Sequence, residues 1–305
     1  MVWWLLFRTT TPWLETSVTR FRKTFAALAA VLVVAVAIVV SLTLYQLQKD
    51  HVQTVHLIGH LDDADRVDLD VVVIQIDAAL QEMSVQVTPM PRGALADELG
   101  RFRADTTIDL YGVKPEPILA KAGETISASE VRIAMGGGGM ITDYPFDKYR
   151  VNIDAAAASG DRPVPMVISL YSLDAFFKIL PKIDDEQRGD AIGTVVTVSR
   201  STASLTFALF VMVLMLGLAL AAGTAAFYVL SGKRGLIWPA NTLMAAVLFA
   251  MIPLRNAVPG SPPIGSVIDF GSFFIAETVV ALSLICTVLV GYRHEVGNER
   301  KDAVQ

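Results

Sequence analysis

Three ionisable side chains stand out near the C-terminus because they lie in a Pro/Gly-rich stretch between two strongly apolar runs. They are Arg255, Asp269 and Glu277, within residues 252–277. Isolated charges in or beside such runs are costly, so they mark ion pairs or ion and ligand pathways. Glu277 lies near the start of the last run, where the positive end of a helix dipole tolerates a carboxylate. The stretch predicts a structural ion pair of Arg255 with Asp269 or Glu277, with an ion or ligand pathway as the alternative.

A second group of candidate residues is the segment Tyr144-Pro145-Phe146-Asp147. Pro145 restricts Tyr144 to extended backbone, Phe146 can anchor a loop in apolar surroundings, and Asp147 can cap backbone donors or pair with a base. The segment predicts a structural corner with a buried aromatic. The alternative is a loop that touches the membrane face and, with Arg200 at the entry to the next apolar run, relays its state to the helices.

No catalytic or cofactor motif accompanies these residues. The sequence lacks Gly-x-Ser-x-Gly, Ser-x-x-Lys, Cys-x-x-Cys and a dinucleotide fingerprint. Gly136–Gly139 lacks the Lys-Ser/Thr of a phosphate loop and predicts a flexible hairpin loop. His51, His56 and His60, with the aspartates that follow, lack the glutamate and glycine of known metal motifs. We therefore predict no catalytic residue, no cofactor and no metal site, with weak divalent-cation binding by this acidic stretch as the alternative.

The composition is that of a membrane protein. The mean hydropathy is +0.51, and only 18% of the residues are charged. A net charge of −5 without a basic block argues against nucleic acid as a partner. Four apolar runs are long enough to cross a hydrocarbon layer of about 30 Å. Since unpaired backbone groups are costly in lipid, they predict four transmembrane helices, at residues 25–45, 205–230, 236–254 and 273–290.

Lys and Arg residues set the predicted orientation. They flank the apolar runs in residues 1–24, in the turn at 231–235 and in residues 291–305, so the positive-inside bias places these three segments in the cytosol. Both termini of this multi-pass protein of the plasma (inner) membrane are then cytosolic, and residues 46–204 and 255–272 face outward. The first run exceeds the roughly 7–15 apolar residues of a signal peptide, which favours an uncleaved anchor.

The outward segment, residues 46–204, predicts an extracytoplasmic β-domain inserted after the first helix. It carries 15 Lys/Arg and 24 Asp/Glu, and the one cysteine, Cys286, lies outside it. Alternating, β-branched segments separated by turn residues favour an antiparallel β-sandwich over a barrel. A short helix is expected at Asp174–Leu180, and His51–Asp70 reads as polar and irregular. The predicted strands are Asp68–Asp77, Met83–Pro89, Thr107–Tyr111, Glu130–Met135, Tyr149–Ala155, Pro165–Ser172 and Gly193–Ser199.

Three stretches together resemble a family of actinobacterial, notably mycobacterial, membrane proteins known as domain of unknown function 4436. They are Tyr144–Tyr149, the membrane entry Ser199–Phe207, and the unusual run Leu248–Glu277, in which Ile275 stands where the family prefers Trp. The resemblance covers about residues 65–292. It implies an N-terminal anchor, an outer β-rich domain and three C-terminal helices, and it brings no activity, ligand or catalytic residue.

Pro145-Phe146-Asp147, in an outer β-domain that leads directly into helices, also resembles the signature loop of pentameric ligand-gated channels. Those channels have flanking cysteines and four helices after the β-domain, whereas this chain has no such cysteines and three predicted helices. The resemblance therefore does not carry a pore over to this chain.

The residues support three hypotheses that share the lipid bilayer as a partner. The first is a non-catalytic envelope binding or accessory protein whose outer β-domain contacts a ligand, a lipid or a membrane-protein partner. The second is a homo-oligomeric channel or transporter component, motivated by Glu277, Arg255 and Asn241 in or beside the apolar runs. The third is an envelope enzyme that acts on lipid or glycan through scattered outer carboxylates.

Overall fold

The structure is a computed structural model that describes part of the chain. The described residues are 35, 38–39, 41–43, 45–46, 54–59, 61–110, 117–182, 191–232 and 238–302. The chain divides into two compact units, Met1–Lys49 and Asp50–Gln305, and everything below concerns the second. The predicted cytosolic segment 1–24 and most of the predicted anchor at 25–45 lie outside the described residues.

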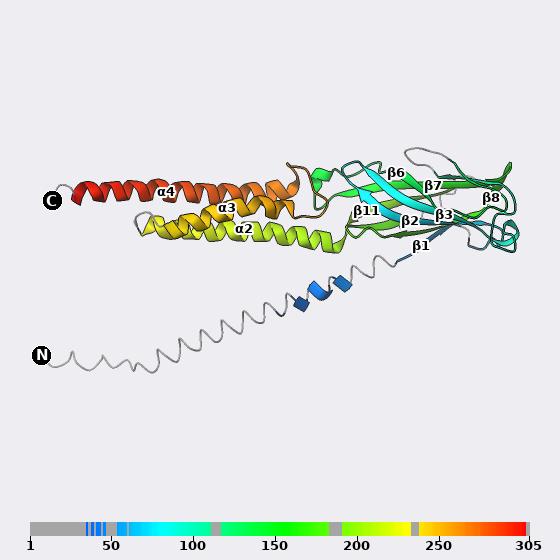
Figure 1. The fold of residues 1–305 in the computed structure, drawn as a ribbon, viewed down its shortest axis with the longest axis horizontal. Helices are drawn as coiled ribbons and strands as arrows, with labels where there is room; N and C mark the ends of the chain where they lie inside the picture. The colour runs from blue at the N-terminus through cyan, green and yellow to red at the C-terminus, as the bar shows by residue number, and fades with distance from the viewer. Residues whose placement is uncertain are drawn as a thin grey trace, which may run out of the picture. The chain divides into compact units, whose positions relative to one another are not determined.

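The first part of this unit is a two-sheet β-sandwich (Figure 1). Neighbouring strands are antiparallel, except that β2 and β9 run parallel. One sheet has, in order, β1 (His56–Gly59), β9 (Met166–Ser172), β2 (Val67–Asp77), β3 (Glu82–Pro91) and β6 (Ser129–Ala134). The other has β10 (Phe177–Lys182), β11 (Ile192–Arg200), β7 (Lys148–Ser159), β4 (Thr106–Leu110) and β5 (Ile118–Ala120), with β8 (Arg162–Val164) on β7. This arrangement confirms the predicted sandwich-like domain.

The sandwich forms because its long strands alternate between apolar and polar residues. On β7, Tyr149, Val151, Ile153 and Ala155 are buried while the residues between them face outward, as the two-residue period of a strand requires. The inward side chains of both sheets join in one core. Burial of apolar surface in this core is the main stabilising term.

Three sequence predictions in this domain are wrong. Asp174–Leu180 is not a helix: it contributes to strand β10, and Pro181 lies within that strand, which is possible because β10 is at a sheet edge. His51–Asp70 is not wholly irregular, because it contains β1 and the start of β2. Gly136–Gly139 is not a hairpin loop, because it lies between β6 of one sheet and β7 of the other.

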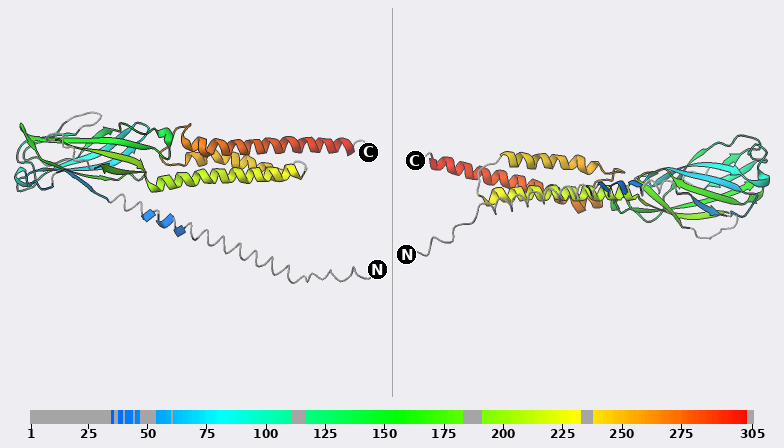
Figure 2. Two further views of the ribbon diagram at one scale, coloured as in Figure 1. Left: turned by 180° about the vertical axis from the view of Figure 1, so that it is seen from behind. Right: turned by 90° about the horizontal axis from the view of Figure 1, so that it is seen from below.

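The helices follow the sandwich directly (Figures 1 and 2). They are α2 (Thr202–Ser231), α3 (Trp238–Asn256) and α4 (Phe274–Asp302), the last preceded by the short π-helical segment η3 (Asp269–Phe273). Two helical segments, Thr202–Ser231 and Asp269–Lys301, are long and apolar enough to cross a membrane by length and composition. Helix α4 continues to Asp302, well beyond residue 290.

Most of the buried side chains of helix α2 are small, although Val211, Met215 and Val229 are buried as well, and many of its exposed side chains are large. Ala208, Ala219, Ala222 and Ala226 are among its buried residues, packed against α3 and α4 in a second core. Its exposed side chains include Phe207, Phe210, Val213, Leu220 and Phe227. A helix of a water-soluble protein has the opposite pattern, with its large apolar residues inside. Small residues at helix contacts, with large apolar residues outside, are typical of helices in lipid.

Candidate functional site at the junction of sandwich and helices

The last strand of the sandwich and the first long helix are joined without a linker. Strand β11 ends at Arg200 and α2 begins at Thr202. Between them, Ser201 is the N-cap of α2 and its side chain accepts a hydrogen bond from the backbone N–H of Ser204, as a helix start requires. The Ser201 N–H donates to the carbonyl of Phe176, at 2.8 Å. The direction of α2 is thus fixed by the sandwich.

Arg200 forms a buried ion pair with Asp147 at this junction. Arg200 Nε lies 3.0 Å from each carboxylate oxygen of Asp147, and Nη2 lies 2.9 Å from Oδ2. The side chains of Arg200 and Asp147 are only 2% and 0% exposed. The guanidinium lies 4.7 Å from the ring centre of Tyr144 and 4.2 Å from that of Phe177. These are cation–π distances, so the charge is held by one carboxylate and two aromatic rings.

The polar groups around this ion pair are not all hydrogen-bonded. Tyr149 Oη donates to Asp147 Oδ2, at 2.9 Å. In contrast, Tyr144 Oη and both terminal nitrogens of Arg200 are buried without a hydrogen-bond partner among the described residues. Nη2 is within ion-pair distance of Asp147 but lacks hydrogen-bond geometry. Such groups are rare in native structures and mark sites where another requirement outweighs hydrogen bonding.

The α3–α4 connection completes the junction from the helix side. Gly260 has φ +82°, and a Cβ at this position would lie 2.4 Å from Nη1 of Arg200. Only glycine therefore allows the connection to approach the guanidinium this closely. Tyr144, although it precedes β7, belongs to the apolar core of the helices together with Val258 and Ile268. The sandwich and the helices thus share one packed interface.

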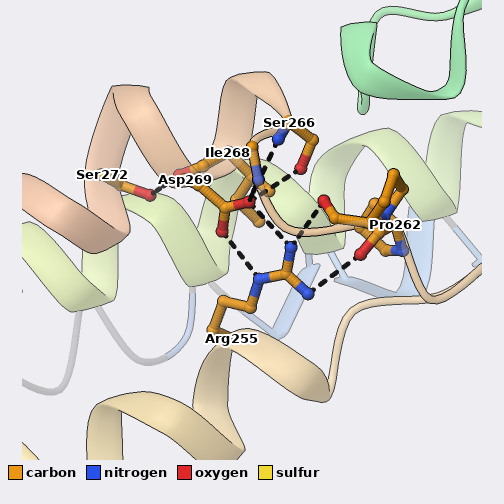
Figure 3. Close-up of polar contacts among 8 residues, drawn as sticks. Arg255, Pro262, Ser266, Ile268, Asp269 and Ser272 are labelled. Atoms are coloured by element: carbon orange, nitrogen blue, oxygen red, sulfur yellow. Dashed lines mark hydrogen bonds and ion pairs between the residues drawn. The ribbon is translucent and has the colours of Figure 1, made fainter.

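A second buried ion pair orders the α3–α4 connection (Figure 3). Arg255 donates to both carboxylate oxygens of Asp269, at 2.7 and 2.8 Å. It also donates to the carbonyls of Pro262 and Pro263, each at 3.0 Å. Asp269 Oδ2 further accepts from the backbone N–H groups of Gly265 and Ser266, at 2.8 and 3.1 Å. The predicted ion pair of Arg255 is confirmed, and its partner is Asp269.

The structure divides the predicted site residues among three places. Tyr144, Asp147 and Arg200 meet at the junction, and Arg255 pairs with Asp269 beside it. Glu277 is half-buried in the first turn of α4 and pairs with neither arginine.

The prediction that Phe146 anchors the loop is wrong. Phe146 is 54% exposed, whereas Pro145 and Tyr144 are buried. The backbone turns through the short helix η2 (Ile141–Asp143), which directs Tyr144 rather than Phe146 into the core. The buried aromatic of the predicted corner is therefore Tyr144.

Sequence reasoning missed three residues of the junction: Tyr149, Phe177 and Gly260. Tyr149 follows Asp147 by two residues, so both lie on one face of the chain entering β7, and this spacing could have indicated it. Phe177 lies in the segment predicted as a helix. Gly260 carries no sequence signal, since its role depends on the approach of a distant strand.

The two buried tyrosines should respond oppositely to the same substitution. Tyr149→Phe is expected to lower the free energy of unfolding by about 1.5–3 kcal/mol, because a buried carboxylate loses a donor. Tyr144→Phe is expected to be neutral or to stabilise by about 1 kcal/mol, because the buried hydroxyl that it removes has no partner among the described residues. Denaturant titration of the two variants and the native chain measures both. Equal losses would contradict the hydrogen-bond pattern.

Alkaline titration tests the same pair of variants in a second way. Burial raises the pKa of Tyr144 from its ordinary 10.0 to about 12, with Arg200 and Arg255 lowering it and Asp147 raising it. Burial and the nearby Asp147 also raise the pKa of Tyr149. A raised pKa in the folded state stabilises below the unfolded value, and this contribution disappears as pH rises from about 10 towards 12. The free energy of unfolding of Tyr144→Phe should therefore fall less steeply with pH than that of the native chain in this range.

Gly260 and Gly265 offer a matched test of the contact with Arg200. Both have positive φ, but a Cβ on Gly265 would meet nothing within 4 Å. Ala at either position carries a backbone strain of about 1–2 kcal/mol. At Gly260 the new methyl group also meets a guanidinium that Asp147 and two rings hold in place, which should add about 1–3 kcal/mol. Thermal unfolding of Gly260→Ala and Gly265→Ala provides the comparison, and equal shifts would show that Arg200 moves aside freely.

A groove of about 720 Å³ lies away from the junction, where edge strands β5 and β6 leave the sandwich open. Sequence reasoning did not indicate it. Its size is within the range of small-molecule sites. Half of its sixteen lining residues have polar side chains: Glu82, Lys121, Glu124, Thr125, Ser127, Ser129, Glu130 and Arg132. In the described part of the chain, no group of three His, Cys, Asp or Glu could hold a metal ion.

The comparisons with known families divide the chain at the junction. Residues 58–199 match the family described as Domain of unknown function (DUF4436). Residues 200–294 match the one described as Domain of unknown function (DUF8686). The boundary falls at Arg200, where the sandwich ends. No curated protein matches the chain. The actinobacterial origin implied by the resemblance stays a prediction.

Proposed function

We propose a role for this chain from its own structure, because residues 58–199 match a family described only as a domain of unknown function (DUF4436). It is a non-catalytic plasma-membrane protein with an outer binding domain and four transmembrane helices. The sandwich binds a ligand, an envelope lipid or a partner protein, and the junction transmits binding to the helices. The DUF8686 segment supplies three of these helices.

The pattern of side chains on the helices supports the membrane placement. Large apolar side chains are exposed on α2, whereas most of its buried side chains are small, which is unfavourable in water and favourable in lipid. Trp238 begins α3 and is exposed, a position typical of a side chain at a membrane interface. Asn241 is buried and accepts a hydrogen bond from Thr287, at 2.9 Å. Polar pairs of this kind hold helices together in lipid.

In this proposed placement both termini are cytosolic, as the Lys and Arg distribution predicts.

The buried contact of Arg200 with Asp147 and Gly260 is the observation that carries the proposal. Arg200 is the last residue of the sandwich, Asp147 directly precedes β7, the neighbour of β11 in the same sheet, and Gly260 belongs to the α3–α4 connection. A shift of either loop would expose or strand a buried charge, which is costly. The helices can therefore respond to a change in the sandwich without a flexible linker that absorbs it.

The groove between β5 and β6 is the candidate binding site on the sandwich. Three hydroxyl groups, three carboxylates and two basic groups line it, and these suit a polar ligand. Strand β6 ends at Ala134, shortly before the segment that leads to Tyr144. Ligand contacts on β6 are thus connected to the junction through about ten residues of chain.

Native mass spectrometry of the full chain, extracted from its own membrane in mild detergent, tests the proposal. The expected result is a complex of fixed stoichiometry with another protein or a bound lipid. A variant with Arg132→Ala and Lys121→Ala in the groove should lose a ligand bound there, while Arg162→Ala, away from the groove, serves as the control. A closed homo-oligomer with nothing else bound would contradict the proposal.

Glu277 supports a second candidate function, that of a homo-oligomeric channel or transporter component. It is a half-buried carboxylate in the first turn of α4 and forms no ion pair with the described residues. An unpaired carboxylate within a span is a functional candidate. Flux of ions or solutes through proteoliposomes tests this role, and a Glu277→Gln variant that leaves the flux unchanged would count against it.

A further inference from the structure

The end of the sandwich next to the helices is more apolar than a solvent-exposed rim requires. Three of its loops expose large apolar side chains: Leu80 on the β2–β3 turn, Phe146 before β7, and Leu173 and Phe176 before β10. Ser199 pairs with Lys148 across β11 and β7, and Ser201 bonds to Phe176. Phe146 and Phe176 therefore flank the residue at which α2 begins. We call these four side chains the apolar rim.

Two lysines lie one residue row farther from the helices than the apolar rim. In the strand register, Ser199 of β11 faces Lys178 of β10 on one side and Lys148 of β7 on the other. Residues opposite one another in a sheet share a face, and neighbouring strands are about 4.8 Å apart. The two lysine Cα atoms are thus roughly 10 Å apart, so two long flexible side chains can reach one anionic group. Neither lysine forms an ion pair within the described ranges.

The acidic side chains near the rim already accept hydrogen bonds or lie close to an arginine. Asp77 accepts the backbone N–H groups of Ala79 and Leu80. Asp174 is buried and accepts from Ile76, Phe176 and Phe177. Asp147 pairs with Arg200, Glu82 lies 3.8 Å from Arg132, and Asp143 accepts from the backbone N–H of Met140, at 3.4 Å. Among the described residues, Lys148 and Lys178 are therefore the basic side chains of this row without an ion-pair partner, although residues 46–204 as a whole carry more Asp/Glu than Lys/Arg.

We propose that the apolar rim, with Lys148 and Lys178, binds anionic phospholipid headgroups in the leaflet where α2 begins. This inference rests on the proposed membrane placement. Exposed apolar patches mark interaction surfaces, and here Phe176 is hydrogen-bonded through its backbone to the N-cap of α2, a helix with exposed apolar side chains. The headgroup layer is about 5–8 Å thick, so it contains the row of Lys148 and Lys178. Lys182, four residues further along β10, lies roughly 13 Å farther from the start of α2.

We assign a lipid surface as the partner of the rim and the two lysines, because the apolar and basic residues are layered along the direction of α2. The aromatic side chains lie level with the helix start, where the hydrocarbon begins, and the lysines lie one row further out, where phosphates would be. An acidic protein partner would not require this order. A bilayer does, because its apolar and anionic layers are stacked in the same sequence.

Native mass spectrometry of the full chain in lipid nanodiscs tests the proposal. The discs contain equal amounts of phosphatidylcholine and phosphatidylglycerol, and the readout is the number of each lipid retained. Each Lys→Gln change at 148 or 178 should reduce phosphatidylglycerol retention about five-fold, and the double variant roughly thirty-fold. Lys182→Gln, with the same charge on the same strand, should change it less than about two-fold.

One further double variant and a competitor sharpen the result. Phe146→Ser with Phe176→Ser should reduce retention of both lipids, since these side chains contact no headgroup charge. Inorganic phosphate should not displace phosphatidylglycerol, and displacement would instead indicate a simple anion site. Equal phosphatidylglycerol retention in the native chain and the double lysine variant would overturn the proposal, as would an equal loss in Lys182→Gln. A chain that leaves the disc altogether would instead overturn the proposed membrane placement.

Discussion

Asp269→Ala is expected to lower the free energy of unfolding by about 3–5 kcal/mol, because it strands the buried guanidinium of Arg255. Arg255 loses both of its carboxylate contacts and keeps only the carbonyls of Pro262 and Pro263. The backbone N–H groups of Gly265 and Ser266 lose their acceptor as well. Titration with a denaturing detergent from mixed micelles measures the loss. Glu277→Gln is the matched control and should cost less than about 1 kcal/mol.

The double variant Arg255→Met/Asp269→Ala separates the ion pair from the rest of the connection. It buries no charge, so it should be more stable than Asp269→Ala alone, even though it removes more contacts. The swapped pair Arg255→Asp/Asp269→Arg should recover little. A carboxylate at 255 cannot donate to the proline carbonyls, and a guanidinium at 269 cannot accept from the backbone. Equal damage from the single and double variants would refute the role of the pair.

The sequence was sufficient to predict elements that follow a local period. Strands β2, β3, β7 and β11 alternate between apolar and polar residues over many positions, so both their type and their approximate bounds could be predicted. Strand β10 has no such local signal, and its Phe177–Lys182 segment contains Pro181. It is a strand because it pairs with β11 along its whole length. Tertiary pairing overrides local preference at such positions.

The same distinction applies to the candidate site. Arg255 and Asp269 are scarce charges in an apolar stretch, fourteen residues apart, so their pairing could be predicted. Asp147 and Arg200 were both identified as candidates, but they are 53 residues apart, one just before β7 and the other at the end of β11. Their contact depends on the register of β7 with β11, which sequence patterning does not specify. The choice between Tyr144 and Phe146 as the buried aromatic depends on the turn at η2.

Asp147→Ala is the second substitution for which we expect a large effect. It leaves Arg200 as an uncompensated charge whose side chain is 2% exposed, and removes the acceptor of Tyr149. The expected loss is about 3–5 kcal/mol in the free energy of unfolding. Arg200→Lys should cost on the order of 2 kcal/mol, because an ammonium lacks the planar group that stacks between Tyr144 and Phe177. Denaturant titration measures both, and a loss below about 1 kcal/mol for Asp147→Ala would contradict the buried pair.

The double variant Asp147→Leu/Arg200→Met distinguishes stability from coupling. Apolar replacements of a buried ion pair are often neutral or stabilising, so the folded state should persist. The close packing of the Arg200 guanidinium against Gly260 is lost, however, and with it one contact between the sandwich and the α3–α4 connection. Hydrogen exchange in residues 257–268 should therefore become faster while exchange in β7 and β11 stays slow. Unchanged exchange in the connection would show that apolar packing around Tyr144 alone holds the sandwich and the helices together, and the ion pair would then have no role in coupling them.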